Sequence, residues 1–78
     1  MTKRIDEMYA FVAVDPADDT EGITAFVEPG GTAMPMVGAD MERVDSLRPV
    51  AESMAKRFGQ TIQVLRFSQR TEIEVISP

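Results

Sequence analysis

The chain has 78 residues, of which 13 are acidic and 8 are basic, so its formal net charge is −5. This length accommodates one small core, and we expect a single domain over residues 1–78 with flexible ends at 1–7 and 77–78. The absence of Cys and His excludes disulfide bonds and removes the commonest metal ligand and general base. No run approaches the ~20 apolar residues of a membrane span, and residues 1–7 lack the apolar core of a secretory signal. We therefore expect a cytoplasmic protein.

The charges are unevenly distributed along the chain. Residues 1–42 hold nine acidic and two basic side chains, whereas residues 43–70 hold six basic and two acidic ones. Such asymmetry is typical of a protein that binds an oppositely charged partner. The alternative is that the two halves fold together and partly neutralise each other across the surface, and the sequence favours this simpler interpretation.

The first half of the chain predicts an antiparallel hairpin. Met8–Val14 (MYAFVAV) and Gly22–Glu28 (GITAFVE) are rich in β-forming residues and predict two strands. Between them, Asp15–Glu21 (DPADDTE) has the composition of a turn, because Pro fixes φ and Asp side chains bond their own backbone. Two strands joined by a polar loop most simply pair with each other.

A short third strand is predicted at Ala33–Val37, after a turn at Pro29-Gly30. Pro followed by Gly is typical of the central positions of a type II turn, in which the second residue has a positive φ. Pro35 cannot donate a backbone hydrogen bond, so this strand belongs at a sheet edge. An exposed edge is a natural contact for another protein. The candidate partner-binding residues are Met34, Pro35, Met36 and Val37.

The segment from Asp40 to Phe58 predicts a helical region that Pro49 divides. Proline in a helix interior loses a hydrogen bond and clashes with the carbonyl four residues earlier. We therefore expect a short helical turn over 40–44 and a main helix that begins near Asp45 or Ser46, with Pro49 in its first turn. Gly59 is expected to end the helix in a left-handed conformation. One apolar face at helical spacing comprises Leu47, Val50, Ala51, Met54, Ala55 and Phe58.

Two further strands are predicted at Thr61–Phe67 and Thr71–Ile76, joined by Ser68-Gln69-Arg70 as a hairpin. The expected order is β-β-β-α-β-β. This predicts an α+β fold, a single small domain in which one main helix packs on an antiparallel or mixed sheet.

Both faces of the first predicted strand are apolar, because successive side chains point to opposite sides of a sheet. One face carries Tyr9, Phe11 and Ala13, and the other carries Met8, Ala10, Val12 and Val14. The strand after the helix repeats this pattern, with Ile62 and Val64 on one face and Leu65 and Phe67 on the other. One helix covers only one face of a sheet, whereas a half-solvated strand alternates cleanly. We therefore predict a homodimer in which a second copy covers the other face.

Two groups of residues were considered as metal sites. The acidic loop, with Asp15, Asp18, Asp19 and Glu21, lacks the ligand spacing and the sixth-position glycine of a calcium-binding EF-hand loop. Met34, Met36 and Met41 supply thioethers, but a Cu(I) site usually includes His or Cys as well. The loop is therefore expected to be a solvated turn, the methionines to be apolar filler, and no metal or cofactor is expected.

Basic residues in the second half offer an alternative function, contact with nucleic-acid phosphates. The candidate residues are Arg48, Lys56, Arg57, Arg66 and Arg70. Glu52 interrupts the helical part of this set, the net charge has the wrong sign, and no nucleic-acid-binding motif is present. Convergence of these cations on one face would favour nucleic acid, and pairing with the acidic half would favour a protein partner.

Catalysis is not expected from this sequence. Without His, no Ser or Thr has the usual neighbouring base. Glu72 and Glu74 share a strand face and could in principle act as a carboxylate pair. However, a domain of this size is expected to offer little room for a pocket of ~300 Å³.

The pattern EGITAF…MPMVGAD…RVDSLRPVAESMAKRFGQTIQVLRFSQR, over residues 21–70, resembles small uncharacterised proteins of actinobacteria and actinobacteriophages. The resemblance brings no catalytic residues. It implies a cytoplasmic accessory protein, encoded by a phage or mobile element, that acts by binding a host protein. Together with the residue patterns, it leads us to expect a small non-enzymatic interaction protein.

Overall fold

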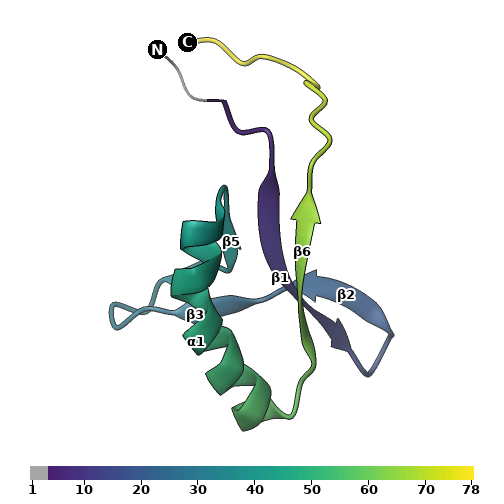
Figure 1. Ribbon diagram of the computed structural model, residues 1–78, viewed down its shortest axis with the longest axis vertical. Helices are drawn as coiled ribbons and strands as arrows, with labels where there is room; N and C mark the ends of the chain where they lie inside the picture. Colours follow the sequence, from purple (N-terminus) through teal and green to yellow (C-terminus); the bar gives the residue numbers. More distant parts are fainter. Residues whose placement is uncertain (1–3) are drawn as a thin grey trace.

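The computed structural model describes residues 4–78 and has the predicted α+β class, with one helix and antiparallel sheets (Figure 1). Residues 1–3 of the predicted N-terminal end lie outside this range. The elements in chain order are β1 (Met8–Asp15), β2 (Thr20–Ile23), β3 (Ala25–Val27), β4 (Ala33–Pro35), β5 (Val37–Gly38), α1 (Met41–Phe58) and β6 (Ile62–Phe67).

β1 is the central strand of the main sheet. One of its edges is shared: β5 pairs with Tyr9 and Ala10, and β2 pairs with Val12–Asp15. Its other edge pairs with β6, from Met8 opposite Phe67 to Ala13 opposite Ile62. All three pairings are antiparallel, which confirms the predicted hairpin of the first two strands.

The second and third predicted strands are each divided where they pass the middle of β1. The Phe11 N–H donates to the Met36 carbonyl (3.0 Å), and the Thr24 N–H donates to the Phe11 carbonyl (2.9 Å). The Met36 N–H in turn donates to the Thr24 carbonyl (2.8 Å). Beyond this junction the chain leaves the main sheet as a separate two-stranded hairpin, β3–β4. Pro35 therefore lies in an edge strand, as predicted.

The turn of the β3–β4 hairpin differs from the predicted type II turn. The positive φ occurs at Gly31 (87°), not at Gly30. The Gly31 N–H donates to the Glu28 carbonyl (2.8 Å), and the Glu28 N–H donates to the Thr32 carbonyl (2.9 Å). This is the arrangement of a three-residue hairpin loop, which ends with a left-handed residue. Of the two glycines, only the second needs the conformational freedom that a side chain would remove.

The helix α1 is continuous from Met41 to Phe58, so the predicted division into a short turn over 40–44 and a main helix from Asp45 or Ser46 is wrong. It begins after Asp40, whose carboxylate accepts from the Arg43 N–H at 2.9 Å, and this cap outweighs the weaker alternatives at Asp45 and Ser46. Pro49 lies inside the helix and is exposed. Its missing N–H therefore leaves the Asp45 carbonyl on the solvent side, where water satisfies it. The helix ends at Gly59 in the left-handed conformation, as predicted.

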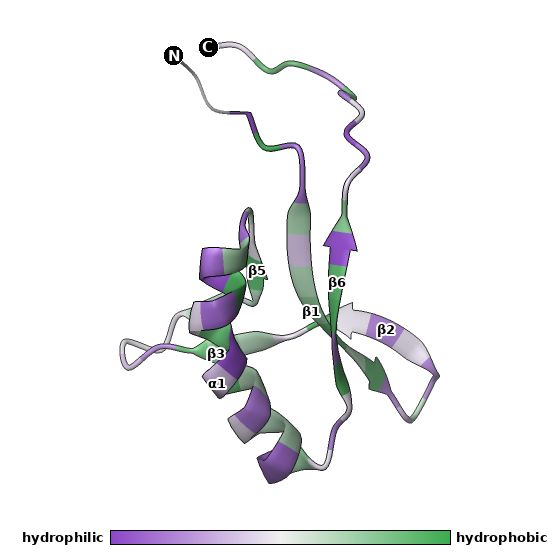
Figure 2. Cartoon of the chain, in the orientation of Figure 1, coloured by the Kyte–Doolittle hydropathy of each residue, from purple (hydrophilic) through white to green (hydrophobic). Residues whose placement is uncertain are grey.

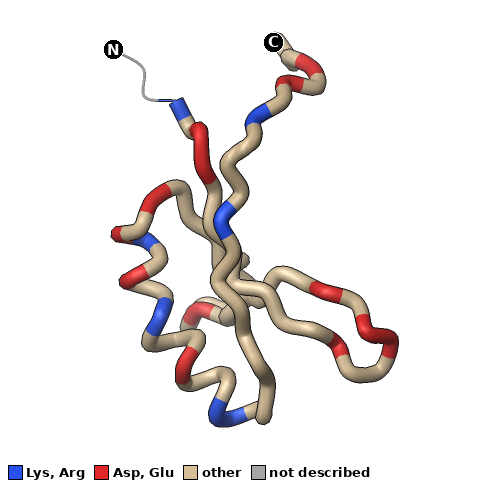
Figure 3. The backbone as a smooth tube through the Cα atoms, turned by 45° about the vertical axis from the view of Figure 1, so that its right-hand side comes forward, with Lys and Arg blue, Asp and Glu red and all other residues tan. Residues whose placement is uncertain are grey.

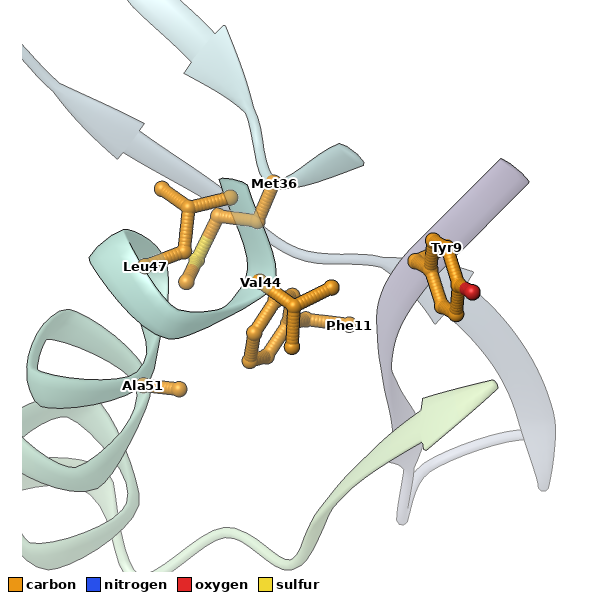
Figure 4. Packing of buried hydrophobic residues seen from close by; sticks show 6 residues of the cluster. All are labelled: Tyr9, Phe11, Met36, Val44, Leu47 and Ala51. Carbon is orange, nitrogen blue, oxygen red and sulfur yellow. The ribbon is translucent and has the colours of Figure 1, made fainter. Parts of the chain in front are cut away.

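The core lies between α1 and one face of the main sheet. Phe11, Met36, Val44 and Leu47 converge beneath the helix, as Figure 4 shows, and Ala51 and Tyr9 complete the buried cluster. The predicted apolar face of the helix is correct for its first three turns. The prediction omitted the buried Val44, because it started the main helix after this residue. It wrongly included Phe58, which is exposed.

The predicted final strand, Thr71–Ile76, is absent. Residues 68–78 have no regular secondary structure and are exposed throughout. They continue from β6 away from the body of the molecule, beside the N-terminal residues that precede β1 (Figure 1). The guanidinium of Arg70, in the C-terminal segment, lies 3.9 Å from the carboxylate of Asp6, in the segment before β1. The radius of gyration is consequently 14.7 Å, against about 11.5 Å for a compact domain of this length.

Candidate interaction surface

The main sheet has a covered face and an open face. Phe11 on β1 points towards α1, and Tyr9, two residues earlier, shares its face of the strand; both belong to the buried cluster. Ala10 and Val12 point the opposite way, since side chains alternate along a strand. They are buried by neighbouring strands, yet they are not part of the cluster beneath the helix. We call the side of the sheet opposite α1 the open face.

The strand register identifies the other residues of the open face, because residues opposite each other in an antiparallel pair share a face. Ala10 is opposite Leu65 on β6 and Val37 on β5, and Val12 is opposite Ile23 on β2. The large apolar side chains that remain substantially exposed on this face are Met8, Val14, Ile23 and Phe67. Figure 2 shows apolar residues along most of β1 and β6. The open face thus carries four exposed large apolar side chains around the buried Ala10 and Val12, on the side of the sheet away from α1.

A hollow of about 490 Å³ lies at one end of the open face. Val12, Val14 and Gln63 line its sheet side, and Phe58 at the end of α1 is among the residues on the other sides. A second hollow of about 500 Å³ lies between the β1–β2 hairpin and the helix, beside Met54 and Gln60. Both hollows are larger than the ~300 Å³ for which we expected little room in so small a domain. Phe58, wrongly assigned to the core from its helical spacing, instead extends the apolar surface.

The outer edge of β6 forms a second feature of this surface. Within residues 4–78, β6 pairs only with β1. Its other edge carries backbone groups with no strand opposite them. A groove of about 250 Å³ runs beside it, between β6 and α1, and Phe11, Ile62 and Val64 are part of its apolar lining. This combination of an unpaired edge and an apolar groove is typical of sites that accept an added strand.

The structure separates the four predicted partner-binding residues. Met36 is fully buried in the core at 0% exposure, where its sulfur accepts from the Thr24 hydroxyl at 3.2 Å. Val37 is half-buried at the open face, and Met34 and Pro35 lie in the β3–β4 hairpin outside the main sheet. Met36 is therefore a structural residue, and only the remaining three are accessible to a partner.

The five candidate nucleic-acid contacts do not form one patch. Figure 3 shows basic residues spread along the length of the molecule, from the end of the helix to the segment after β6. Arg48 pairs with Asp45 at 2.7 Å, and Arg70 lies 3.9 Å from Asp6. Arg57 and Lys56 occupy the last helical turn, where the Arg57 guanidinium stacks over Phe58. Arg66 lies on β6, opposite Tyr9.

The acidic loop is a compact turn held by its own carboxylates. Asp15 accepts from the Ala17 N–H at 2.9 Å, and Asp18 accepts from both the N–H and the hydroxyl of Thr20, at 3.1 and 2.6 Å. These bonds, above all that from the Thr20 hydroxyl, lower the pKa of Asp18 below its ordinary value. Across residues 4–78, no group of three or more acidic side chains is placed to hold a metal ion.

The sequence anticipated part of this surface. The two-sided apolar pattern of β1 and β6 correctly indicated an uncovered face containing Leu65 and Phe67. It did not indicate Ile23 or Val37, because their positions depend on the division of their strands at Thr24 and Met36. The free edge of β6 was also missed, since the sequence assigned a strand to that position.

Comparison with known protein families, with curated proteins and with solved structures finds no match to this chain. Over the described residues, α1 does not have the length and apolar character needed to cross a bilayer. The functional assignment therefore rests on the geometry of the surface described above.

Proposed function

We propose that this chain is a small, non-enzymatic protein-interaction protein that forms a homodimer through the open face of its sheet. The observation that supports the proposal is the group of exposed apolar side chains around the buried Ala10 and Val12, which includes Ile23 and Phe67 at 59% and 55% exposure. Each such side chain that passes from half-exposed to buried contributes about 1 kcal/mol to association. Several together supply a sizeable driving force.

Charge favours a second copy as the partner. Two chains that each carry −5 repel each other unless their contact surface is poor in charge. On the open face, the paired positions of β1, β5 and β6 are uncharged, and β2 adds Glu21 at the margin, opposite Val14. Asp18 and Asp19 lie in the turn beyond the sheet, and Asp15, at the end of β1, belongs to the face opposite the open face. Contact between two open faces therefore keeps most of the negative charge apart.

We propose further that the chain acts in the cell as an accessory protein that binds another protein. The resemblance to actinobacterial and phage proteins supports a role as a cytoplasmic accessory protein that binds a host protein, and an interaction surface is the only chemistry such a role requires. Nucleic acid is the less favoured partner, because the basic residues are dispersed and two of them are close to carboxylates.

Sedimentation equilibrium at micromolar concentration tests the proposal. We expect a mass of twice the 8.6 kDa of one chain. Ile23→Glu, on the open face, is expected to shift the equilibrium to monomer. Val27→Glu is the matched control, since Val27 is also exposed but lies on β3 outside the main sheet. A wild-type chain that remains monomeric would contradict the proposal, and equal effects of the two variants would remove the open face from it.

A further inference from the structure

The segment after β6 has the sequence of a strand without the structure of one. Residues 71–76 (TEIEVI) alternate and are rich in β-branched side chains, a pattern that favours a half-buried strand. In the structure the same residues have no regular secondary structure and lie beyond the body of the molecule, where the chain bends across towards its N-terminal end (Figure 1). Ile73, Ile76 and Val75 are 93%, 84% and 72% exposed, more than any other large apolar residue that the structure describes. Such exposure of three β-branched residues is costly in water.

Within the described chain, the free edge of β6 lacks a partner strand, which the segment 71–76 could supply. Its outward backbone groups have no partner strand within residues 4–78, and exposed edges of this kind are usually protected by proline, a bulge or several charges. The strand Ile62–Phe67 (IQVLRF) has no proline and a single charge, at Arg66. Among the described residues, Arg66 has no carboxylate within salt-bridge distance, unlike Arg48 and Arg70.

We propose that residues 71–76 of one copy add as an antiparallel strand to the free edge of β6 in a second copy, and reciprocally. This exchange rests on the homodimer proposed above and specifies how part of the open face is covered. The two copies are related by a two-fold axis near Arg70, so that the strand beginning at Ile62 and running through the C-terminal segment lies against its own symmetry mate.

The register follows from matching side chains on each face. With Val75 opposite Leu65 and Ile73 opposite Phe67, these two apolar residues of the added strand extend the open face. The same register places Glu74 opposite Arg66, on the side of the helix. Shifting the register by one residue would place Glu72 and Glu74 beside the apolar Leu65 and Phe67, because a one-residue slip reverses both faces of a strand. Charge and hydropathy therefore select the same orientation.

One more pair supports this register. Ile76 falls opposite Val64, which is 45% exposed and lines the groove between β6 and α1. The added strand thus covers apolar surface on both sides of the sheet. At the axis the two Arg70 side chains face each other, and each retains Asp6 of its own chain at 3.9 Å, which offsets part of their repulsion.

The local sequence favours exchange between copies over a hairpin within one chain. A tight hairpin needs a residue with positive φ in its loop, supplied most often by Gly, Asn or Asp. Ser68, Gln69 and Arg70 include none of these. The chain accordingly runs past them without turning back (Figure 1). A strand that cannot fold back on its own β6 remains available to the β6 of a second copy.

Truncation is the first test of the exchange. Because residues 71–78 are exposed and contact no core residue, a chain ending at Arg70 is expected to stay folded by circular dichroism. Its dimer dissociation constant is expected to rise at least about 10-fold, whereas a chain ending at Ile76 keeps wild-type affinity. If the chain ending at Arg70 dimerises as well as the full chain, the exchange is wrong while association through the open face survives. A monomeric full chain would contradict both proposals.

Cross-linking tests the register and separates exchange from folding back. The chain contains no cysteine, so Leu65→Cys and Val75→Cys introduce the only thiols. When the two single variants are mixed and mildly oxidised, we expect a covalent heterodimer on a non-reducing gel, because opposite strand positions lie within disulfide reach. Leu65→Cys mixed with Glu74→Cys is the out-of-register control. If the single variants fail to cross-link and only the double variant in one chain does, the segment folds back and the exchange is wrong.

A charge reversal tests the proposed ion pair. Arg66→Glu is expected to weaken the dimer several-fold, and the double variant Arg66→Glu with Glu74→Arg is expected to restore it. Restoration by the second change distinguishes pairing across the interface from a simple folding defect at Arg66. If the double variant is as weak as the single one, Glu74 does not lie opposite Arg66 and the register is wrong.

Discussion

The two faces of β1 have similar composition but opposite surroundings. Phe11 and Phe67 are both phenylalanines of the main sheet, yet Phe11 is 1% exposed beneath α1 and Phe67 is 55% exposed on the open face. The residue type alone does not account for this difference in exposure. Apolar content predicts that a face seeks burial, whereas the number of available covering elements decides whether the cover comes from the same chain. Here one helix is available for two faces.

The same substitution on each face of the sheet is expected to have very different effects. Phe11→Ala is expected to lower the free energy of unfolding by about 3–5 kcal/mol, which approaches the whole stability of a small domain. Phe67→Ala is expected to change the stability of the monomer by about 1 kcal/mol or less and to weaken self-association instead. Urea denaturation followed by circular dichroism measures the first effect, and sedimentation equilibrium measures the second.

Equal loss of stability in the two variants would show that the open face is already covered within the monomer. An unfolded Phe11→Ala chain would still satisfy the prediction, since its cost is expected to be large. Val44→Ala, at a buried position of the helix, removes fewer atoms from the same core between α1 and the sheet and should lower the stability by less.

The next largest effect is expected where β5 leads into the helix. A Cβ at Gly38 would lie 2.7 Å from the Arg43 Cβ and nearer still to its Cγ, so the helix start would have to shift. Gly38→Ala is expected to cost about 1–3 kcal/mol by overpacking. Gly22→Ala is the matched control, because a Cβ there meets no atom within 4 Å. In thermal unfolding, the melting temperature of Gly38→Ala should be clearly lower than that of Gly22→Ala. Equal melting temperatures would contradict the close approach of helix and sheet.

A smaller effect, of opposite sign, is expected at Pro49. Proline inside a helix is about 3 kcal/mol less favourable than alanine, and its restriction of the unfolded chain recovers about 0.4–1 kcal/mol. Pro49→Ala should therefore raise the free energy of unfolding by about 2 kcal/mol in urea. Ser53→Ala, also exposed on α1, is the control for helix propensity. Because Pro49 faces solvent, the dimer dissociation constant should not change, and a weaker dimer would place Pro49 in the interface.

The smallest expected effect concerns pH and the acidic turn. The Thr20 hydrogen bonds hold the pKa of Asp18 below its ordinary value of 3.8. The folded state therefore binds fewer protons than the unfolded state, and the stability due to this carboxylate is present above pH 3.8 and is lost as pH falls through the lowered pKa. Asp18→Asn removes this titration. The stability difference between wild type and Asp18→Asn should be constant at neutral pH and change only in acid, and a change near neutral pH would contradict this assignment.

The sequence by itself determined the elements whose signals are local. Gly59 ends the helix because a left-handed terminator needs no distant contact. The DPADDTE loop is a turn because its carboxylates bond neighbouring backbone groups. The two-sided apolar pattern of β1 and β6 was also sufficient to predict that one face lies open, since it depends only on strand geometry and on the presence of one helix.

Other features depend on contacts between residues that are distant in the sequence, and these became clear only in the tertiary structure. Pro49 remains within a helix because its side is solvated and Asp40 supplies a better cap, and Met36 enters the core because its strand divides at β1. Residues 71–76 have the pattern of a strand, yet a strand forms only where an edge is within reach. Ser68, Gln69 and Arg70 offer no turn that would bring residues 71–76 back to β6, so the strand pattern alone was not sufficient to predict their structure.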